Sequence, residues 1–332
     1  MPSEPRRTGS KVLNRRRRVR GIHVLVAESP AASSGTGVSP LDTKTVQRYL
    51  DLLGCSDNRS CSLGNLRQLQ RAHLNLIAYE NVDIHLGRPP CSLNPADSVQ
   101  RILQGRGGAY CYVQNGALAA LLVSLGYDIS LHSCAVSEDE ADLSERGNHM
   151  AIVVHGYPVP NVAPDGQWVV DVGLGDGPKY PFPLQAQQWS DTPFTYSLEP
   201  RPYGWRFKHD QQGSFVGFNL EVSPLARGVC CFEENHKSLW TAEDSSFVKT
   251  LVLQRRAENF TITLRGCFLT RIDSSGKQVE HVLSKDEFFA TMSRHFFINE
   301  SRFTELERSQ LWSRTYTAHK SRQQSLEANS SD

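Results

Sequence analysis

The chain has 332 residues, 39% hydrophobic and 21% charged, which is typical of globular proteins and sufficient for one large domain or about two to three smaller ones. Its 36 Lys and Arg residues are balanced by 35 Asp and Glu residues, leaving a formal net charge of +1. A protein that binds nucleic acid needs a basic excess over its folded part, so this balance argues against a nucleic-acid partner.

The first 40 residues differ in composition from the rest of the chain. Basic residues crowd the first twenty positions, and Ser, Gly, Ala and Pro dominate residues 31–40. We predict a disordered basic arm over residues 1–40, with a nuclear or transit-peptide targeting role as the alternative. The apolar run at residues 22–27 is too short for a signal peptide or a membrane span, so we predict no membrane partner and a cytoplasmic location.

The eight cysteines lack the spacing of a metal site. They form no CxxC pair, and no histidines are spaced around them as a zinc site requires. We therefore predict free thiols in a reducing compartment and no metal cofactor.

Residues 41–126 carry the pattern of helices. Apolar residues recur at i, i+3, i+4 and i+7 from Val46 to Leu53, and Gly54 follows as a C-cap. Asn94 and Pro95 form a good N-cap and first-turn pair. Four helices are predicted, at residues 46–53, 66–77, 94–105 and 111–125. We assign residues 41–126 to a helical domain.

Beyond Gly126 the pattern changes to alternating apolar residues broken by Pro and Gly, which predicts an antiparallel sheet or barrel over residues 127–240. The predicted strands are 129–135, 150–155, 167–172, 194–198, 203–208 and 214–222. An α/β domain is predicted over residues 241–312, with strands at 247–254 and 260–271, a helix opened by a capping box at residues 284–287, and a short helix at 305–312. Residues 313–332 are polar and are predicted to be a flexible tail.

The glycine-rich segment at residues 105–108 leads directly to Cys111. The pattern places this cysteine in the first turn of the fourth helix, where the partial positive charge of a helix N-terminus stabilises a thiolate. Cys111 is therefore a candidate nucleophile, and a buried structural thiol is the alternative on this segment alone.

A nucleophilic cysteine needs a base and a group that orients the base. His149 stands just before one apolar strand and Asp171 at the end of another, so a hairpin would bring the two together. Taken singly, His149 could be a capping or surface histidine and Asp171 a turn residue before Gly173. The segment Gly173–Gly177 is not a dinucleotide site, because the prolines at 178 and 181 prevent a helix from following it.

These segments resemble motifs of the arylamine N-acetyltransferases, in the same order and over residues 45–298. The cysteine segment, the stretch from His73 to His85, the His149-Met150 pair and the segment Val170–Gly175 each have a counterpart in that family. The resemblance implies an α+β fold: a helical N-terminal domain, an antiparallel β-barrel and an α/β lid. It also implies a papain/transglutaminase-like triad of Cys111, His149 and Asp171, and a buried structural ion pair between Glu80 and Arg106.

The sequence departs from the family pattern near the site. One residue more than usual separates Arg106 from Cys111, and Ala109 looks inserted. Tyr79 and Leu174 replace two phenylalanines that line the acceptor pocket in the family, so we assign both to substrate binding and expect an altered acceptor preference.

The resemblance implies a ping-pong transfer of an acetyl or other short acyl group from acyl-coenzyme A to an arylamine or hydrazine, through a thioester on Cys111. Acetyl-CoA is then the donor substrate, and its coenzyme A part is expected near the backbone of Gly173 and Gly175. Two alternatives remain at this point. One is a cysteine hydrolase or amide-forming enzyme on the same triad, and the other is a non-catalytic relic whose cysteine was displaced by Ala109.

Overall fold

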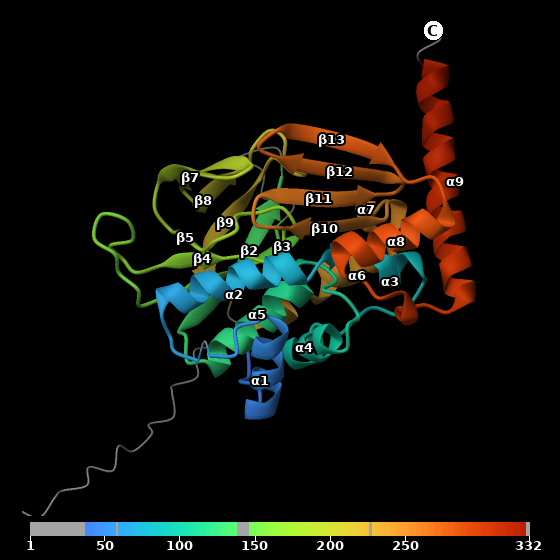
Figure 1. Cartoon of the computed structure of the whole chain (residues 1–332). Helices are drawn as coiled ribbons and strands as arrows, with labels where there is room; N and C mark the ends of the chain where they lie inside the picture. The colour runs from blue at the N-terminus through green and yellow to red at the C-terminus, as the bar shows by residue number, and fades with distance from the viewer. Residues whose placement is uncertain (1–36, 58, 138–145, 226–227, 330–332) are drawn as a thin grey trace, which may run out of the picture. The chain divides into compact units, whose positions relative to one another are not determined.

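The structure is a computed structural model that describes residues 37–57, 59–137, 146–225 and 228–329. Most of the predicted basic arm therefore lies outside the described residues. Figure 1 shows a group of helices, a curved sheet and a second sheet flanked by the C-terminal helices. Among the helices in the described ranges, none combines the length and apolar composition of a membrane span.

The four predicted N-terminal helices are confirmed, and side chains cap the N-termini of the first two. Asp42 accepts a hydrogen bond from Thr45 N, and Ser62 accepts one from Asn65 N, so orphan amides of the first turns are satisfied. The helices are α1 (Thr43–Leu52), α2 (Leu63–Leu76), α3 (Val82–His85), α4 (Pro95–Leu103) and α5 (Cys111–Ser124).

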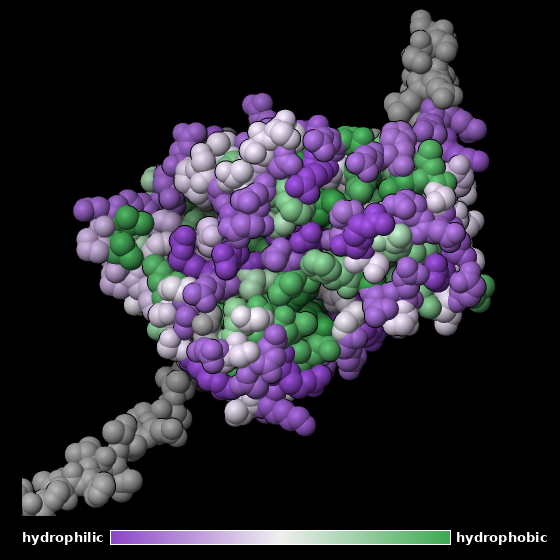
Figure 2. All heavy atoms as spheres, in the orientation of Figure 1, coloured by the Kyte–Doolittle hydropathy of each residue, from purple (hydrophilic) through white to green (hydrophobic). Residues whose placement is uncertain are grey.

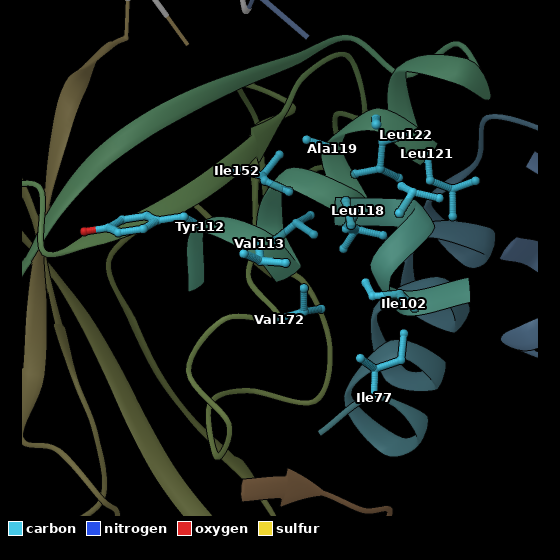
Figure 3. Close-up of a cluster of buried hydrophobic side chains, with 14 of the residues drawn as sticks. Ile77, Ile102, Tyr112, Val113, Leu118, Ala119, Leu121, Leu122, Ile152 and Val172 are labelled. Carbon is cyan, nitrogen blue, oxygen red and sulfur yellow. The ribbon is translucent and has the colours of Figure 1, made fainter. Parts of the chain in front are cut away.

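Helix α5 is the centre of the largest hydrophobic core. Every residue from Cys111 to Leu122 is buried, so this helix is enclosed on all sides and has no solvent-facing polar stripe there. Figure 3 shows Leu118 and Leu122 of α5 among side chains from neighbouring elements, including Ile102 of α4. On the face seen in Figure 2, hydrophobic residues gather beneath α2, where Figure 1 places α4 and α5. The cysteine thus begins a helix that the core holds from all directions.

The larger sheet has eight antiparallel strands in the order β5-β4-β3-β2-β9-β8-β7-β6. They are β2 (Ile129–Val136), β3 (His149–Val154), β4 (Trp168–Val170), β5 (Phe182–Pro183), β6 (Gln187–Asp191), β7 (Phe194–Arg201), β8 (Gly204–Lys208) and β9 (Gly217–Pro224). Its two edge strands, β5 and β6, are joined by residues 184–186 alone, so the sheet must curl round on itself. Aromatic side chains from β5, β7, β8 and β9 fill the space it encloses.

The register of β3 and β4 places the two predicted polar residues on one face. Ile152 pairs with Val170, so continuing the ladder sets Asp171 opposite Ala151. His149 lies two residues before Ala151, and side chains two apart along a strand point to the same side of a sheet. His149 and Asp171 are therefore diagonal neighbours.

The smaller sheet has the order β1-β10-β11-β12-β13 and takes its first strand from the helical part of the chain. Tyr79 of β1 pairs with Gln254 of β10, and Glu80 pairs with Leu253. The strands are β1 (Tyr79–Glu80), β10 (Val252–Arg256), β11 (Phe260–Arg265), β12 (Phe268–Asp273) and β13 (Gly276–His281). The surrounding helices are η1 (Gly228–Phe232), α6 (Glu233–Thr241), α7 (Ser246–Lys249), α8 (Lys285–Phe296), η2 (Glu300–Arg302) and α9 (Glu305–Asn329).

Three predictions for this region are corrected. The predicted strand 247–254 begins as helix α7, because the Ser245 hydroxyl accepts from Phe247 N and caps a helix there. The predicted strand 260–271 is two strands, separated by a turn in which Gly266 takes a φ of +59°.

Helix α9 also differs from the prediction, because it extends through most of the predicted flexible tail. Thr304 and Glu307 form a reciprocal capping box, with Thr304 N donating to the carboxylate and Glu307 N donating to the hydroxyl. Trp312 then stacks on Tyr316 with ring centroids 4.9 Å apart. The remaining domain boundaries stay predictions.

Candidate active site

Three predicted side chains from separate elements lie together. Cys111 is the first residue of α5, His149 the first of β3, and Asp171 follows β4. The Nε2 of His149 and the Oδ2 of Asp171 are 2.6 Å apart, and the Cys111 sulfur lies 3.8 Å from the carbonyl oxygen of Asn148. Only 4%, 2% and 1% of Cys111, His149 and Asp171 are exposed, so the surface reading of His149 is wrong.

The charge state of His149 is set by its neighbours. Burial lowers the pKa of His149, but the charge and hydrogen bond of Asp171, together with the Cys111 sulfur, outweigh it and raise that pKa from 6.5 to about 10. The imidazole is therefore held in its charged form at neutral pH. A buried imidazolium between a carboxylate and a sulfur can stabilise a thiolate and return a proton to a leaving group.

Asn115 fixes the position of Asp171 and was given no role by the sequence. Its Nδ2 donates to Asp171 Oδ1 at 2.9 Å, and its Oδ1 accepts from Val172 N at 2.8 Å. Gly173 N also donates to Asp171 Oδ1, so both carboxylate oxygens have partners. The signal was present in the sequence, because Asn115 is a polar residue in a largely apolar helix and, four positions after Cys111, lies on the same face.

The two glycines predicted to contact coenzyme A permit close packing at the site. A Cβ on Gly173 would lie 2.5 Å from the Cα of Cys111, and one on Gly175 would lie 2.5 Å from Oε1 of Gln254. Gly175 also has a φ of +78°, which other residues rarely adopt. Both positions therefore require glycine for packing, and their contact with coenzyme A stays a prediction.

Cys111 lies at the wall of a cavity of about 440 Å³, within the range of small-molecule sites. Tyr79 and Leu174, the residues predicted to bind substrate, both line it together with His149. Phe247 of α7 and Phe215 add aromatic walls that the sequence did not assign. The cavity can hold an apolar ring next to the sulfur.

The extra residue before Cys111 is absorbed by the backbone. Gly105, Gly107 and Ala109 alternate with other residues and all have positive φ, Ala109 at 52°. The carbonyl of Ala109 accepts from Glu80 N at 2.8 Å, which holds this strained residue in place. Because Cys111 still reaches the cavity and His149, the displacement that the relic reading requires is absent.

The predicted ion pair between Glu80 and Arg106 is wrong. Arg101 of α4 takes the place of Arg106, with its Nη2 2.8 Å from Glu80 Oε1 and its Nη1 2.6 Å from Asp83 Oδ2. The Arg106 side chain is 50% exposed, and its Nη2 lies 4.0 Å from Asp83 Oδ2. It lies beyond the end of α4, at the start of the positive-φ turn, so its side chain points away from Glu80 toward solvent.

The buried network around Arg101 supports the cysteine segment. Glu80 Oε1 also accepts from Ala109 N, two residues before Cys111, and Arg302 reaches Asp83 at 2.8 Å. Burial raises the pKa of Asp83, but Arg101 and Arg302 outweigh it and hold that pKa well below 3.8. The network therefore joins α4, the cysteine segment and η2.

Known proteins share the family and the fold of this chain. An N-acetyltransferase family model matches residues 62–304. The arylamine N-acetyltransferase of Mycolicibacterium smegmatis is 32% identical over 131 residues, which is 38% of this chain and 45% of that protein. The Salmonella typhimurium protein named arylamine N-acetyltransferase / N-hydroxyarylamine O-acetyltransferase is 28% identical over 249 residues, 72% of this chain and 83% of that one.

A solved structure, the Mycobacterium marinum arylamine N-acetyltransferase in complex with CoA, superposes with a TM-score of 0.71 and 23% identity. It covers 82% of this chain and 99% of that one. This likeness confirms the predicted α+β fold.

Replacing Arg101 tests the network. Arg101→Leu leaves Glu80 and Asp83 buried without their main cation, so we expect the free energy of unfolding to fall by about 3–5 kcal/mol. Arg106→Leu is the matched control and should cost less than about 1 kcal/mol, since Arg106 is half exposed. Urea unfolding measures both, and an equal loss in the two variants would contradict this assignment.

The same network predicts a pH dependence of stability. The pKa of Asp83 is lowered on folding, so its ion pairs stabilise the protein above about pH 4 and lose that contribution as the pH falls further. Urea unfolding between pH 3 and pH 7 should therefore show a steeper acid loss in wild type than in Arg101→Leu. Parallel pH profiles would count against it.

Proposed function

The chain belongs to the N-acetyltransferase family, and on that premise we propose that it moves an acetyl or other short acyl group from acyl-coenzyme A to the nitrogen of an arylamine or hydrazine. The observation that supports this most is the contact of Asp171 with His149 at the wall of the cavity that Cys111 also lines. Transfer through a thioester on Cys111 uses all three groups.

In the first half-reaction, His149 holds the proton of Cys111 and the thiolate attacks the carbonyl carbon of the acyl-CoA thioester. The tetrahedral intermediate carries a negative oxygen, for which the backbone N–H of Cys111 is a candidate donor, because first-turn amides are not used within the helix. The carbon–sulfur bond to coenzyme A then breaks. The leaving thiolate takes the proton from His149, and the acyl group remains on Cys111.

In the second half-reaction, the acceptor nitrogen attacks the acyl-cysteine. Arylamines and hydrazides, the acylated hydrazines, are uncharged at neutral pH, so their lone pair is available. His149 takes the proton from the attacking nitrogen, the carbon–sulfur bond breaks, and the amide leaves. Asp171 stabilises the imidazolium at each step. A hydrogen bond from Asn115 holds the Asp171 carboxylate in position.

The walls of the cavity favour an aromatic acceptor. Phe247 approaches Tyr79 with ring centroids 6.3 Å apart, and Leu174 lies on the same cavity. An acceptor ring between these side chains would place its nitrogen toward Cys111. Because Tyr79 is a phenol and Leu174 is shorter than phenylalanine, we expect a preference for wider or more polar acceptors than a phenyl-lined pocket takes.

The solved relative from Mycobacterium marinum contains CoA, which supports coenzyme A as the donor carrier here. We place its thioester beside Cys111, with its pantetheine end passing the backbone of Gly173 and Gly175. A cytoplasmic location, where acetyl-CoA is available, remains part of this proposal.

Incubation with acetyl-CoA in the absence of an acceptor tests the thioester. Intact-mass spectrometry should show a gain of one acetyl group that Cys111→Ser abolishes, and adding an arylamine should remove it and yield the amide. Propionyl-CoA and malonyl-CoA in parallel define the acyl range. Rapid release of coenzyme A with no adduct and no amide would instead indicate a hydrolase.

Replacing Asp171 tests the charge pair. Asp171→Asn removes the carboxylate that raises the pKa of His149, so the imidazole loses its proton at a lower pH and no longer provides a positive charge beside the Cys111 sulfur at neutral pH. We expect inactivation by iodoacetamide at neutral pH to slow and turnover to fall by about 10²–10⁴-fold. Asp165→Asn, an exposed carboxylate of the hairpin between β3 and β4, is the control. Matching profiles in the two variants would contradict the proposed role.

A further inference from the structure

We propose that a second cavity, enclosed by α9, α7 and the turn between β11 and β12, binds a small organic acid with an apolar body, such as an aromatic carboxylate. Its volume is about 340 Å³, at the lower end of the range for small-molecule sites. The helices that enclose it stand at the right of Figure 1. The catalytic proposal assigns no role to this cavity.

The walls of this cavity come from segments that hydrogen bonds hold together. Arg314 of α9 donates to the carbonyl oxygens of His85 and Val248, at 3.2 and 3.0 Å. These bonds fasten α9 to the end of α3 and to α7. The apolar part of the lining includes Val248, Leu251 and Phe268. The cavity is therefore part of the packed fold, with an apolar interior suited to a ring or short chain.

Several buried polar atoms on α9 have no hydrogen-bond partner among the described residues. Both ring nitrogens of His319 and the hydroxyl of Thr315 are inaccessible to solvent and make no hydrogen bond in the described chain. The two residues are one helical turn apart, so they face the same way, and both line the cavity. A buried polar group without a partner is costly, and rotation of these side chains toward the hydrogen-bonding groups of a ligand would satisfy their polar atoms.

The charge of the lining favours an anion. Lys249, Arg265 and Arg314 line the cavity, and no Asp or Glu does. Lys249 and Arg265 form no ion pair with any residue of the described ranges. Cations without a nearby carboxylate produce a positive potential, which attracts a carboxylate to the mouth of an apolar site.

The histidines act as uncharged hydrogen-bonding groups. Burial, with a contribution from Arg314, lowers the pKa of His85 to about 4, and burial with His281 lowers the pKa of His319. The ring of His319 packs edge-on against Phe268 with centroids 4.9 Å apart, which fixes its plane. A neutral imidazole held in this way can donate one hydrogen bond and accept another.

Helix α7 separates this cavity from the one at Cys111. Phe247 lines the catalytic cavity, whereas Val248 and Lys249, the next two residues, line the second. Arg265 borders both. A bound acid would therefore occupy space directly behind Phe247 without entering the acceptor pocket.

The test uses 2-naphthoate as the probe, with the neutral ketone 2-acetylnaphthalene as its match. Isothermal titration should show one site per chain and at least about tenfold weaker binding of the ketone, since the carboxylate meets the cations. His319→Phe and Thr315→Val keep side-chain shape and remove unpartnered polar atoms, so thermal stability should hold or rise. Each should weaken 2-naphthoate binding by about fivefold or more.

Lys320→Met is the matched control on α9, because Lys320 lies next to His319 in the chain and does not line the cavity. It should leave binding unchanged, whereas Lys249→Met should weaken it. A titration with saturating coenzyme A present shows whether the cavity binds a free acid or a part of the coenzyme A donor. Three outcomes would overturn the proposal: no saturable binding, equal binding by His319→Phe, or displacement of the probe by coenzyme A.

This readout is binding, so it does not depend on acyl transfer. An inactive protein that still binds 2-naphthoate through His319 would refute the proposed function and support the second site. An active protein that fails to bind 2-naphthoate would support the proposed function and refute the second site.

Discussion

The site depends on the close approach of the backbone at Gly173 to the first turn of α5. A Cβ at that position would lie 2.5 Å from the Cα of Cys111, so only glycine allows the end of β4 to meet the helix. This contact lets Asn115 reach Asp171 and Val172 with one side-chain amide. The carboxylate that governs His149 is thus held by the same helix that presents the sulfur.

Most of the fold follows from patterns that the sequence displays. The N-terminal helices show helical periodicity with caps, and the buried strands near His149 and Asp171 show apolar runs between breaks. The positions of His149 and Asp171 beside two strands that a hairpin joins were sufficient to predict that these two meet, whereas the family resemblance implied that Cys111 joins them. The family resemblance also supplied the reaction that we propose, which geometry alone does not.

The parts that were missed depend on contacts distant in sequence. Arg106 matches the family motif, but the arginine that pairs with Glu80 is Arg101, because α4 directs its side chain there. Only the three-dimensional path of the chain reveals this choice. Helix α7 begins at a cap formed by Ser245, and α9 begins at a cap formed by Thr304. In the sequence, a single capping residue is a weak indication of a helix when β-branched or polar residues follow it. Local patterns identify elements more reliably than they identify which buried charges meet.

The two-residue strand β1 has a consequence for how molecules reach the sulfur. Glu80 N bonds to Ala109 O near the cysteine, while Tyr79 and Glu80 pair with β10 and Asn81 bonds to residues 247, 250 and 252. Swinging the C-terminal sheet outward would break this whole ladder and pull Tyr79 from its place. The ladder therefore ties the cavity walls at Tyr79 and Phe247 to the cysteine segment, so the cavity widens at these walls only if the ladder breaks.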